Sequence, residues 1–206
     1  MTTSTLTRRE FLYYIWAASL ALFTAETGGA VLWFALPRFK PGEFGGTITV
    51  PIEKIPEPDS PPVAFDEGRF WLVNIGTKTT TDPVHPNRVV TQTGVIALYK
   101  ICVHLGCLYR WEAALNRFKC PCHSSQYLLD GARVHGPATR DLDKLLMKFV
   151  DANGDELAAT VTGDANADPT VGQALAAPPG AVAILIDSGK RIRGRLSDGP
   201  NTVPDN

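Results

Sequence analysis

Two short motifs of cysteine and histidine constrain this chain more than any other part of its sequence. The first covers residues 102–107 (C-V-H-L-G-C) and the second covers residues 120–125 (C-P-C-H-S-S). Together they hold all four cysteines and two of the four histidines of the 206-residue chain. Four metal ligands and one disulfide would use this whole set. The motifs therefore predict a metal centre held between two loops.

The pattern C-x-H-x-G-C followed by C-x-C-H resembles that of the Rieske iron–sulfur proteins. In that family the first cysteine and the histidine of each motif bind a [2Fe–2S] cluster. The resemblance implies one such cluster here, with Cys102 and Cys120 on one iron and His104 and His123 on the other.

The resemblance also implies a disulfide between the two remaining cysteines, Cys107 and Cys122. A closed zinc site with the same C-x-H and C-x-x-H ligands is the alternative. That site requires neither the extra cysteine in each motif nor the hydroxyl residues that follow the second one. A disulfide further indicates an oxidising compartment outside the cytoplasm.

Two neutral imidazoles in place of two thiolates make a [2Fe–2S] cluster easier to reduce, because they remove negative charge from it. Rieske centres span about −150 to +300 mV, against about −400 mV for plant-type clusters with four cysteines. Histidine also has a second ring nitrogen that can carry or release a proton. One site can then take up an electron and a proton.

Hydroxyl side chains follow the second motif. Ser125 and Tyr127 stand at offsets where high-potential members of the family have donors to a bridging sulfur and to a cysteine ligand. Such donors favour reduction of the cluster. Ser124 stands where the family usually has glycine, so we expect backbone strain if this position needs a positive φ.

Residues 136–139 (G-P-A-T) are similar to the Gly-Pro-x-Pro loop that covers the cluster in the family. Gly136 and Pro137 match that pattern, whereas Thr139 replaces the second proline, so we expect a cover that is kept but less rigid. His135 and His85 are expected to be loop residues rather than ligands.

The N-terminus predicts export and membrane anchoring. Arg8 and Arg9 precede an apolar run over residues 11–36 and match a twin-arginine export signal. An ordinary pair of positive-inside arginines is the alternative, and both readings place the N-terminus on the cytoplasmic side. The run is long enough to cross a bilayer, and no A-x-A-like site follows it, so we expect an uncleaved anchor.

Glu26 lies in the middle of this run among small residues. A charge there is costly unless it faces a partner or is protonated. Contact with other subunits through this face is one hypothesis, and a tolerated glutamate in a long segment is the other.

The remaining sequence predicts a β-rich head. The 18 Gly and 16 Pro, with short runs rich in Val, Thr and Ile, favour many turns and short strands. We expect a loop at 77–88, a surface insertion at 164–179, and turns at Asn153–Gly154 and Ser188–Gly189. Strands are expected at 47–50, 69–75, 95–100, 145–151, 156–162 and 181–187, with a strand and a turn at 127–131 and a small hairpin at 108–119.

The expected fold is thus an all-β Rieske head, made of antiparallel sheets with a small cluster-binding subdomain, preceded by one N-terminal transmembrane helix.

A net charge of −1 gives no electrostatic basis for binding nucleic acid. The expected parts are an N-terminus at 1–10, the anchor at 11–36, a neck at 37–46, the head at 47–196 with its cluster-binding subdomain at about 100–140, and a tail at 197–206. The resemblance implies a flexible neck, and an immobile linker is the alternative.

The resemblance implies a subunit of a quinol:cytochrome c or plastocyanin-like oxidoreductase. The expected partners are a cytochrome b-type subunit, a c-type cytochrome, membrane quinol and the lipid bilayer, within a dimeric multisubunit complex. In that mechanism His104 or His123 accepts the quinol's hydrogen bond and then its proton. The head is expected on the periplasmic or lumenal face of a bacterial cytoplasmic membrane or thylakoid.

Two other classes also contain such clusters. The small subunit of an exported molybdenum oxidoreductase, such as arsenite oxidase, shares the export signal and the cluster motifs but usually lacks a permanent anchor. Rieske ferredoxins and ring-hydroxylating oxygenases lack the disulfide pair and the membrane helix, and the additional cysteines of both motifs argue against them.

Overall fold

The computed structural model describes residues 6–36, 44–81 and 89–196. The chain divides into two compact units, residues 1–38 and 39–206. His85, the predicted tail at 197–206 and all but the last three residues of the predicted neck lie outside the described residues.

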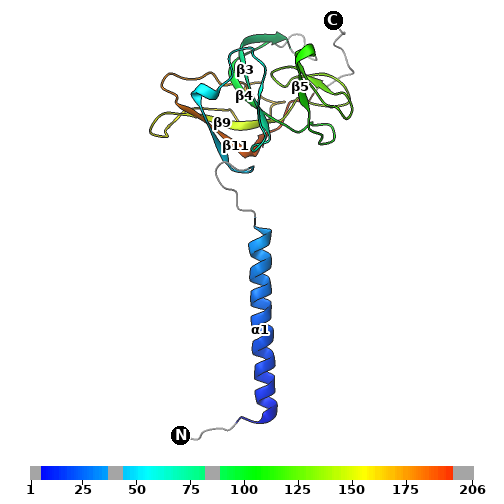
Figure 1. Cartoon of the computed structure of the whole chain (residues 1–206), viewed down its shortest axis with the longest axis vertical. Helices are drawn as coiled ribbons and strands as arrows, with labels where there is room; N and C mark the ends of the chain where they lie inside the picture. Colours follow the sequence, from blue (N-terminus) through cyan, green and yellow to red (C-terminus); the bar gives the residue numbers. More distant parts are fainter. Residues whose placement is uncertain (1–5, 37–43, 82–88, 197–206) are drawn as a thin grey trace. The chain divides into compact units, whose positions relative to one another are not determined.

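The first unit is a single helix, α1 (Arg8–Ala35) (Figure 1). Its start is fixed by a capping box, in which the Thr7 hydroxyl accepts from the Glu10 N–H and the Glu10 carboxylate accepts from the Thr7 N–H. Its 28 residues correspond to about 42 Å, more than the ~30 Å of a bilayer core. None of them is buried within the unit. By length and composition, α1 can cross a membrane.

The head contains two antiparallel sheets (Figure 1). The larger sheet has the order β1-β11-β9-β4-β3-β2, with β10 paired to β9, and the smaller has the order β5-β6-β7-β8. The strands are β1 (Thr47–Pro51), β2 (Val63–Phe65), β3 (Phe70–Thr81), β4 (Val89–Tyr99), β5 (Arg110–Glu112), β6 (Arg117–Lys119), β7 (Gln126–Tyr127), β8 (Arg133–His135), β9 (Lys144–Val150), β10 (Glu156–Ala159) and β11 (Ala183–Ile192), with short 3₁₀ helices at Ile52–Lys54 and Ala113–Leu115. The predicted fold class is confirmed.

Strands β3 and β4 form the wall between two hydrophobic cores. Successive side chains of a strand point to opposite faces, so Phe70 and Leu72 join the core of the larger sheet while Val73 and Ile75 join the core of the subdomain. All four are fully buried. This two-sided burial explains why β3 begins as a nearly continuous apolar run instead of an alternating one.

The smaller sheet belongs to a subdomain that is inserted between β4 and β9, and the two ends of this subdomain meet. The Tyr99 N–H donates to the Asp143 carbonyl at 2.8 Å. The Asp143 carboxylate in turn accepts from both terminal nitrogens of Arg140 and from the Gly194 N–H. Segment 140–143, after β8, is thereby fixed to the chain that follows β11.

Three sequence predictions in the head are wrong. The loop predicted at 77–88 is wrong for residues 77–81, because β3 continues to Thr81 and pairs with β4 from Val89 onward, whereas 82–88 lie outside the described residues. The threonines of 77–81 are β-branched residues that favour such a ribbon. His135 ends β8 opposite Gln126 and is therefore a strand residue, not a loop residue.

The turn predicted at Ser188–Gly189 lies inside β11, where the pairing with β9 shifts between Asp187 and Arg191. Ser188 is held there by residues at the start of the head: its hydroxyl accepts from the Gly45 N–H at 2.8 Å, and its N–H donates to the Gly46 carbonyl at 3.0 Å. The chain therefore bulges instead of turning. The predicted Asn153–Gly154 turn is confirmed between β9 and β10, with Gly154 at φ +89°.

The segment 164–179 is also more than a surface insertion. Leu175 pairs with Val95 of β4, and Val171 and Ala165 are buried against Ile192. Gly94 makes this pairing possible, because a Cβ at this position would lie 2.3 Å from the Leu175 carbonyl oxygen.

Candidate metal centre

The two sequence motifs fold into loops of the same design. In the first, the Cys102 N–H donates to the Cys107 carbonyl at 2.7 Å and the Gly106 N–H donates to the Cys102 carbonyl at 3.0 Å. In the second, the Cys120 and Ser124 N–H groups make the equivalent bonds to Ser125 and Cys120. In each loop the first cysteine uses both its N–H and its carbonyl in these bonds, so the backbone holds this residue on both sides.

The fifth residue of each loop has a left-handed backbone. Gly106 has φ +84° in the first loop, and Ser124 has φ +59° in the second. The serine that replaces the usual glycine therefore stands where an L-residue is strained, as the sequence predicted.

The four cysteines separate into two kinds. Cys107 and Cys122 are joined by a disulfide that links the two loops. Cys102 and Cys120 are free thiols, each 2% exposed. The sulfurs of Cys107, Cys120 and Cys122 lie within 4.8 Å of one another, but Cys107 and Cys122 are bonded to each other and cannot form thiolates, so only Cys120 in this group is available as a thiolate ligand.

The rings of the two motif histidines pack against each other. The ring centroids of His104 and His123 are 4.7 Å apart, with the ring planes at 88°. The Nδ1 atom of His104 is buried and has no hydrogen-bond partner among the described residues. A buried imidazole nitrogen without a partner is costly, and bonding to a metal would remove that cost. His123 is exposed.

Burial is the main influence on the pKa of the Cys102 thiol. Desolvation raises the pKa of Cys102, while hydrogen bonds from the Tyr127 hydroxyl and the His104 N–H act in the opposite direction. The neighbouring Cys120 thiol raises the pKa further, which shows that the two sulfurs interact. A cation between them would reverse this balance and favour both thiolates.

Two buried residues that carry hydroxyl groups, Ser125 and Tyr127, end or follow the second motif. The Tyr127 hydroxyl is 3.3 Å from Cys102 Sγ. Burial, followed by the neighbouring Cys102, raises the pKa of Tyr127, so the phenol remains a donor. The Ser125 hydroxyl accepts from the Ala138 N–H at 3.2 Å and also bonds to the Tyr127 hydroxyl, which lowers the pKa of Tyr127.

The 136–139 loop packs directly on the second motif. Gly136 has φ +95°, and a Cβ there would lie 2.4 Å from Ser125 Cα. Only glycine permits this approach. Pro137 follows, exposed to solvent. The Gly136 carbonyl accepts from Arg133 Nη2 at 2.7 Å. Sequence reasoning missed this arginine, although its position three residues before a glycine-proline turn is a signal that could have indicated it.

An all-β head with free thiols, paired imidazoles and a disulfide between two loops defines an iron–sulfur electron-transfer domain. Residues 74–149 match the family model described as "Rieske [2Fe-2S] domain". The chain belongs to the Rieske iron–sulfur family, and [2Fe–2S] is the cofactor of that domain, as the sequence predicted.

Two relatives that match most of this chain are iron-sulfur subunits of cytochrome b6-f complexes. The chain is 30% identical to the cytochrome b6-f complex iron-sulfur subunit of Synechococcus sp. strain JA-3-3Ab over 67% of this chain and 79% of that protein. It is 32% identical to cytochrome b6-f complex iron-sulfur subunit 1 of Synechocystis sp. strain PCC 6803, over 70% of this chain and 80% of that one. The crystal structure of the plasma membrane Rieske protein PetC3 from Synechocystis PCC 6803 matches at 24% identity with a TM-score of 0.26, covering 43% of this chain and 96% of that one. The sequence relatives carry the family assignment.

The strain at Ser124 leads to a stability prediction. Ser124→Gly is expected to raise the free energy of unfolding by about 0.5–1 kcal/mol, because a left-handed backbone costs an L-residue about 1–2 kcal/mol and glycine loses more chain entropy on folding. Urea denaturation of the full chain in neutral detergent, followed by near-UV circular dichroism, measures this change.

Gly106→Ala is the matched control, because nothing lies within 4 Å of the Cβ that it adds. Only the backbone conformation is then at issue, and the free energy of unfolding should fall. A Ser124→Gly protein no more stable than the parent would show that Ser124 is unstrained.

Proposed function

We propose that the head is a high-potential Rieske centre that oxidises membrane quinol and passes the electron to a c-type cytochrome within a cytochrome bc-type complex. Its ligands are Cys102 and Cys120 on one iron and His104 and His123 on the other. The observation that carries the proposal is the meeting of the two imidazoles, with the buried Nδ1 of His104 unpartnered and a free thiol in each of the two loops.

The surface around the imidazoles supports a membrane quinol as reductant. Leu105 is 70% exposed and Leu108 is 60% exposed, and they follow His104 within the same segment. Exposed leucines beside a reactive group favour contact with an apolar ligand or protein surface. His123 is exposed as well, so an imidazole nitrogen can accept a hydrogen bond from a hydroxyl docked at this surface.

The residues have distinct roles in this proposal. When bound, the [2Fe–2S] cluster supplies the one-electron acceptor. His104 or His123 accepts the quinol's hydrogen bond through its outer nitrogen and takes the proton as the electron leaves. Tyr127 lies within hydrogen-bond distance of Cys102, and with the cluster bound Tyr127 and Ser125 would donate to its sulfur ligands and stabilise the added negative charge. Gly136 and Pro137 cover the site and hold Ser125 in place.

The assembly proposal rests on the named relatives and on α1. Relatives that match most of this chain are subunits of cytochrome b6-f complexes. We therefore propose partnership with a cytochrome b-type subunit and a c-type cytochrome in a dimeric complex. The anchor is α1, with a cytoplasmic N-terminus and the head on the periplasmic or lumenal face.

Electron paramagnetic resonance of reduced native membranes tests this function. A Rieske-type signal whose shape changes when an inhibitor fills the quinol site is the expected result, because the ligand imidazole hydrogen-bonds to the occupant of that site. A signal indifferent to the inhibitor would contradict quinol oxidation and favour the small subunit of an exported molybdenum oxidoreductase. Release of the protein from membranes by a salt wash would point the same way.

The midpoint potential is expected to fall as pH rises, by up to about 59 mV per unit, because one proton taken up with one electron makes reduction less favourable at low proton concentration. Redox titration followed by circular dichroism measures the slope between about pH 6 and pH 10. A potential that stays constant over this range would rule out proton-coupled electron uptake.

Tyr127→Phe is expected to lower the midpoint potential by about 40–60 mV, the equivalent of about 1–1.5 kcal/mol for one hydrogen bond to sulfur. Tyr109→Phe is the matched control. Tyr109 is equally buried and its ring centroid is 6.0 Å from that of Tyr127, but its hydroxyl donates to the Tyr99 carbonyl. Equal shifts in the two variants would show that the Tyr127 hydroxyl has no specific effect on the potential.

A further inference from the structure

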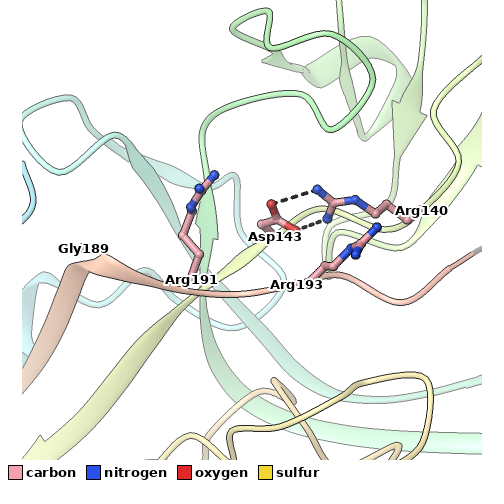
Figure 2. Close-up of a pocket in the computed structure, with 5 residues that line it drawn as sticks. All are labelled: Arg140, Asp143, Gly189, Arg191 and Arg193. Atoms are coloured by element: carbon pink, nitrogen blue, oxygen red, sulfur yellow. Dashed lines mark hydrogen bonds and ion pairs between the residues drawn. The ribbon is translucent and has the colours of Figure 1, made fainter.

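A cleft that the proposed function does not use lies beside β11. It has a volume of about 410 Å³ and is lined by Arg140, Asp143, Gly189, Arg191 and Arg193 (Figure 2). This volume is within the range of about 300–1,000 Å³ that small-molecule sites occupy. Three of the five lining residues are arginines and one is acidic.

The strand places two of the arginines on one face. Arg191 and Arg193 stand on either side of the buried Ile192, which ends β11, so in extended chain their side chains share one side. Figure 2 shows both arginines leaving the same side of this segment. Gly189 contributes no side chain, which leaves that end of the cleft open.

The carboxylate of the cleft does not neutralise these two arginines. Asp143 Oδ1 accepts from Arg140 Nη1 and from the Gly194 N–H, and Oδ2 accepts from Arg140 Nη2 at 3.1 Å (Figure 2). Asp143 is 7% exposed. Its charge and its lone pairs are thus satisfied by Arg140 and the backbone.

The guanidinium of Arg191 is held in position from one side. Its central carbon lies 5.1 Å from the centroid of the Tyr99 ring, which stacks on Phe44. A cation over a ring face keeps its N–H edge available for an acceptor. Among the described residues Arg191 forms no ion pair with a carboxylate.

Arg193 likewise forms no ion pair within the described part of the chain. The acidic group that it influences is Asp164, whose pKa is lowered mainly by hydrogen bonds from Asn166 and only then by Arg193. The Asp164 carboxylate accepts from Asn166 at 2.8 and 2.9 Å, and its charge offsets part of the charge of Arg193. Arg193 still has N–H groups that no carboxylate of the described residues accepts, and such groups can donate to an oxyanion.

We propose that this cleft binds one phosphate-class oxyanion between the guanidinium groups of Arg191 and Arg193. Free phosphate and the phosphate of an anionic lipid headgroup share this chemistry.

Titrations of the full chain in neutral detergent at constant ionic strength test the proposal. The two probes are inorganic phosphate, followed by calorimetry, and phosphatidylglycerol in mixed micelles, followed by native mass spectrometry with phosphatidylcholine as the neutral comparison. One saturable site is expected. Arg191→Gln/Arg193→Gln should weaken binding at least tenfold, and Arg191→Lys/Arg193→Lys should weaken it less, because charge is kept while the planar fork is lost.

Lys190→Gln is the matched control. It removes one positive charge from the same strand, but Lys190 pairs with Asp187 at 3.4 Å and does not line the cleft. Binding should change less than twofold. Circular dichroism and the Rieske-type signal of each variant verify that its head is folded.

The outcomes separate the two sources. Equal affinity for both probes assigns the site to a free oxyanion, and selective retention of phosphatidylglycerol assigns it to a lipid headgroup. Absence of saturable binding by either probe overturns the proposal. So does equal loss of binding in the Lys190→Gln protein and in the double glutamine variant.

Discussion

The structure depends on holding two irregular loops together at a fixed separation. Neither loop is part of a sheet, yet each presents a buried thiol whose position must be defined for a metal to bind. Two backbone hydrogen bonds close each loop on its first cysteine, and the Cys107–Cys122 disulfide joins the loops to each other. The two loops that carry the free thiols are therefore positioned by a covalent bond and by backbone hydrogen bonds. Such constraints do not depend on the rotamers of the surrounding side chains.

The two hydrophobic cores of the head support the two loops. Strands β3 and β4 contribute one face to each of two cores, so the subdomain shares a wall with the larger sheet. The Arg140–Asp143 pair and the Gly194 N–H close the subdomain where the chain leaves it. Removing one partner of such a buried pair leaves an uncompensated charge. Asp143 is also the one carboxylate that lines the arginine cleft, and Arg140 neutralises it. The pair therefore affects both the stability of the head and the charge of that cleft.

Sequence reasoning succeeded where the signal is local and chemical. The motifs and the length of the apolar helix could be predicted from residue types and spacing, and the strained position at Ser124 from the resemblance to a family that usually has glycine there. It failed where a distant segment changes the local outcome. The residues Ser188 and Gly189 have turn chemistry, but bonds to Gly45 and Gly46 keep them within β11. Segment 164–179 has the composition of a surface loop, yet Leu175 pairs with β4 and Val171 is buried.

The sequence by itself determined the kind of chemistry, because the number and types of possible ligands are a property of the residues and not of their arrangement. Four cysteines and two histidines in two motifs predict a Rieske centre before any fold is known. Only the tertiary structure decided which groups are adjacent. It brought Tyr127 to Cys102, Arg133 to the covering loop, and Arg191 and Arg193 to a cleft with Arg140. Some of these contacts join residues far apart in the chain, and others depend on which side of a strand a side chain points to. Sheet pairing and burial decide both the long-range contacts and the orientation of each strand.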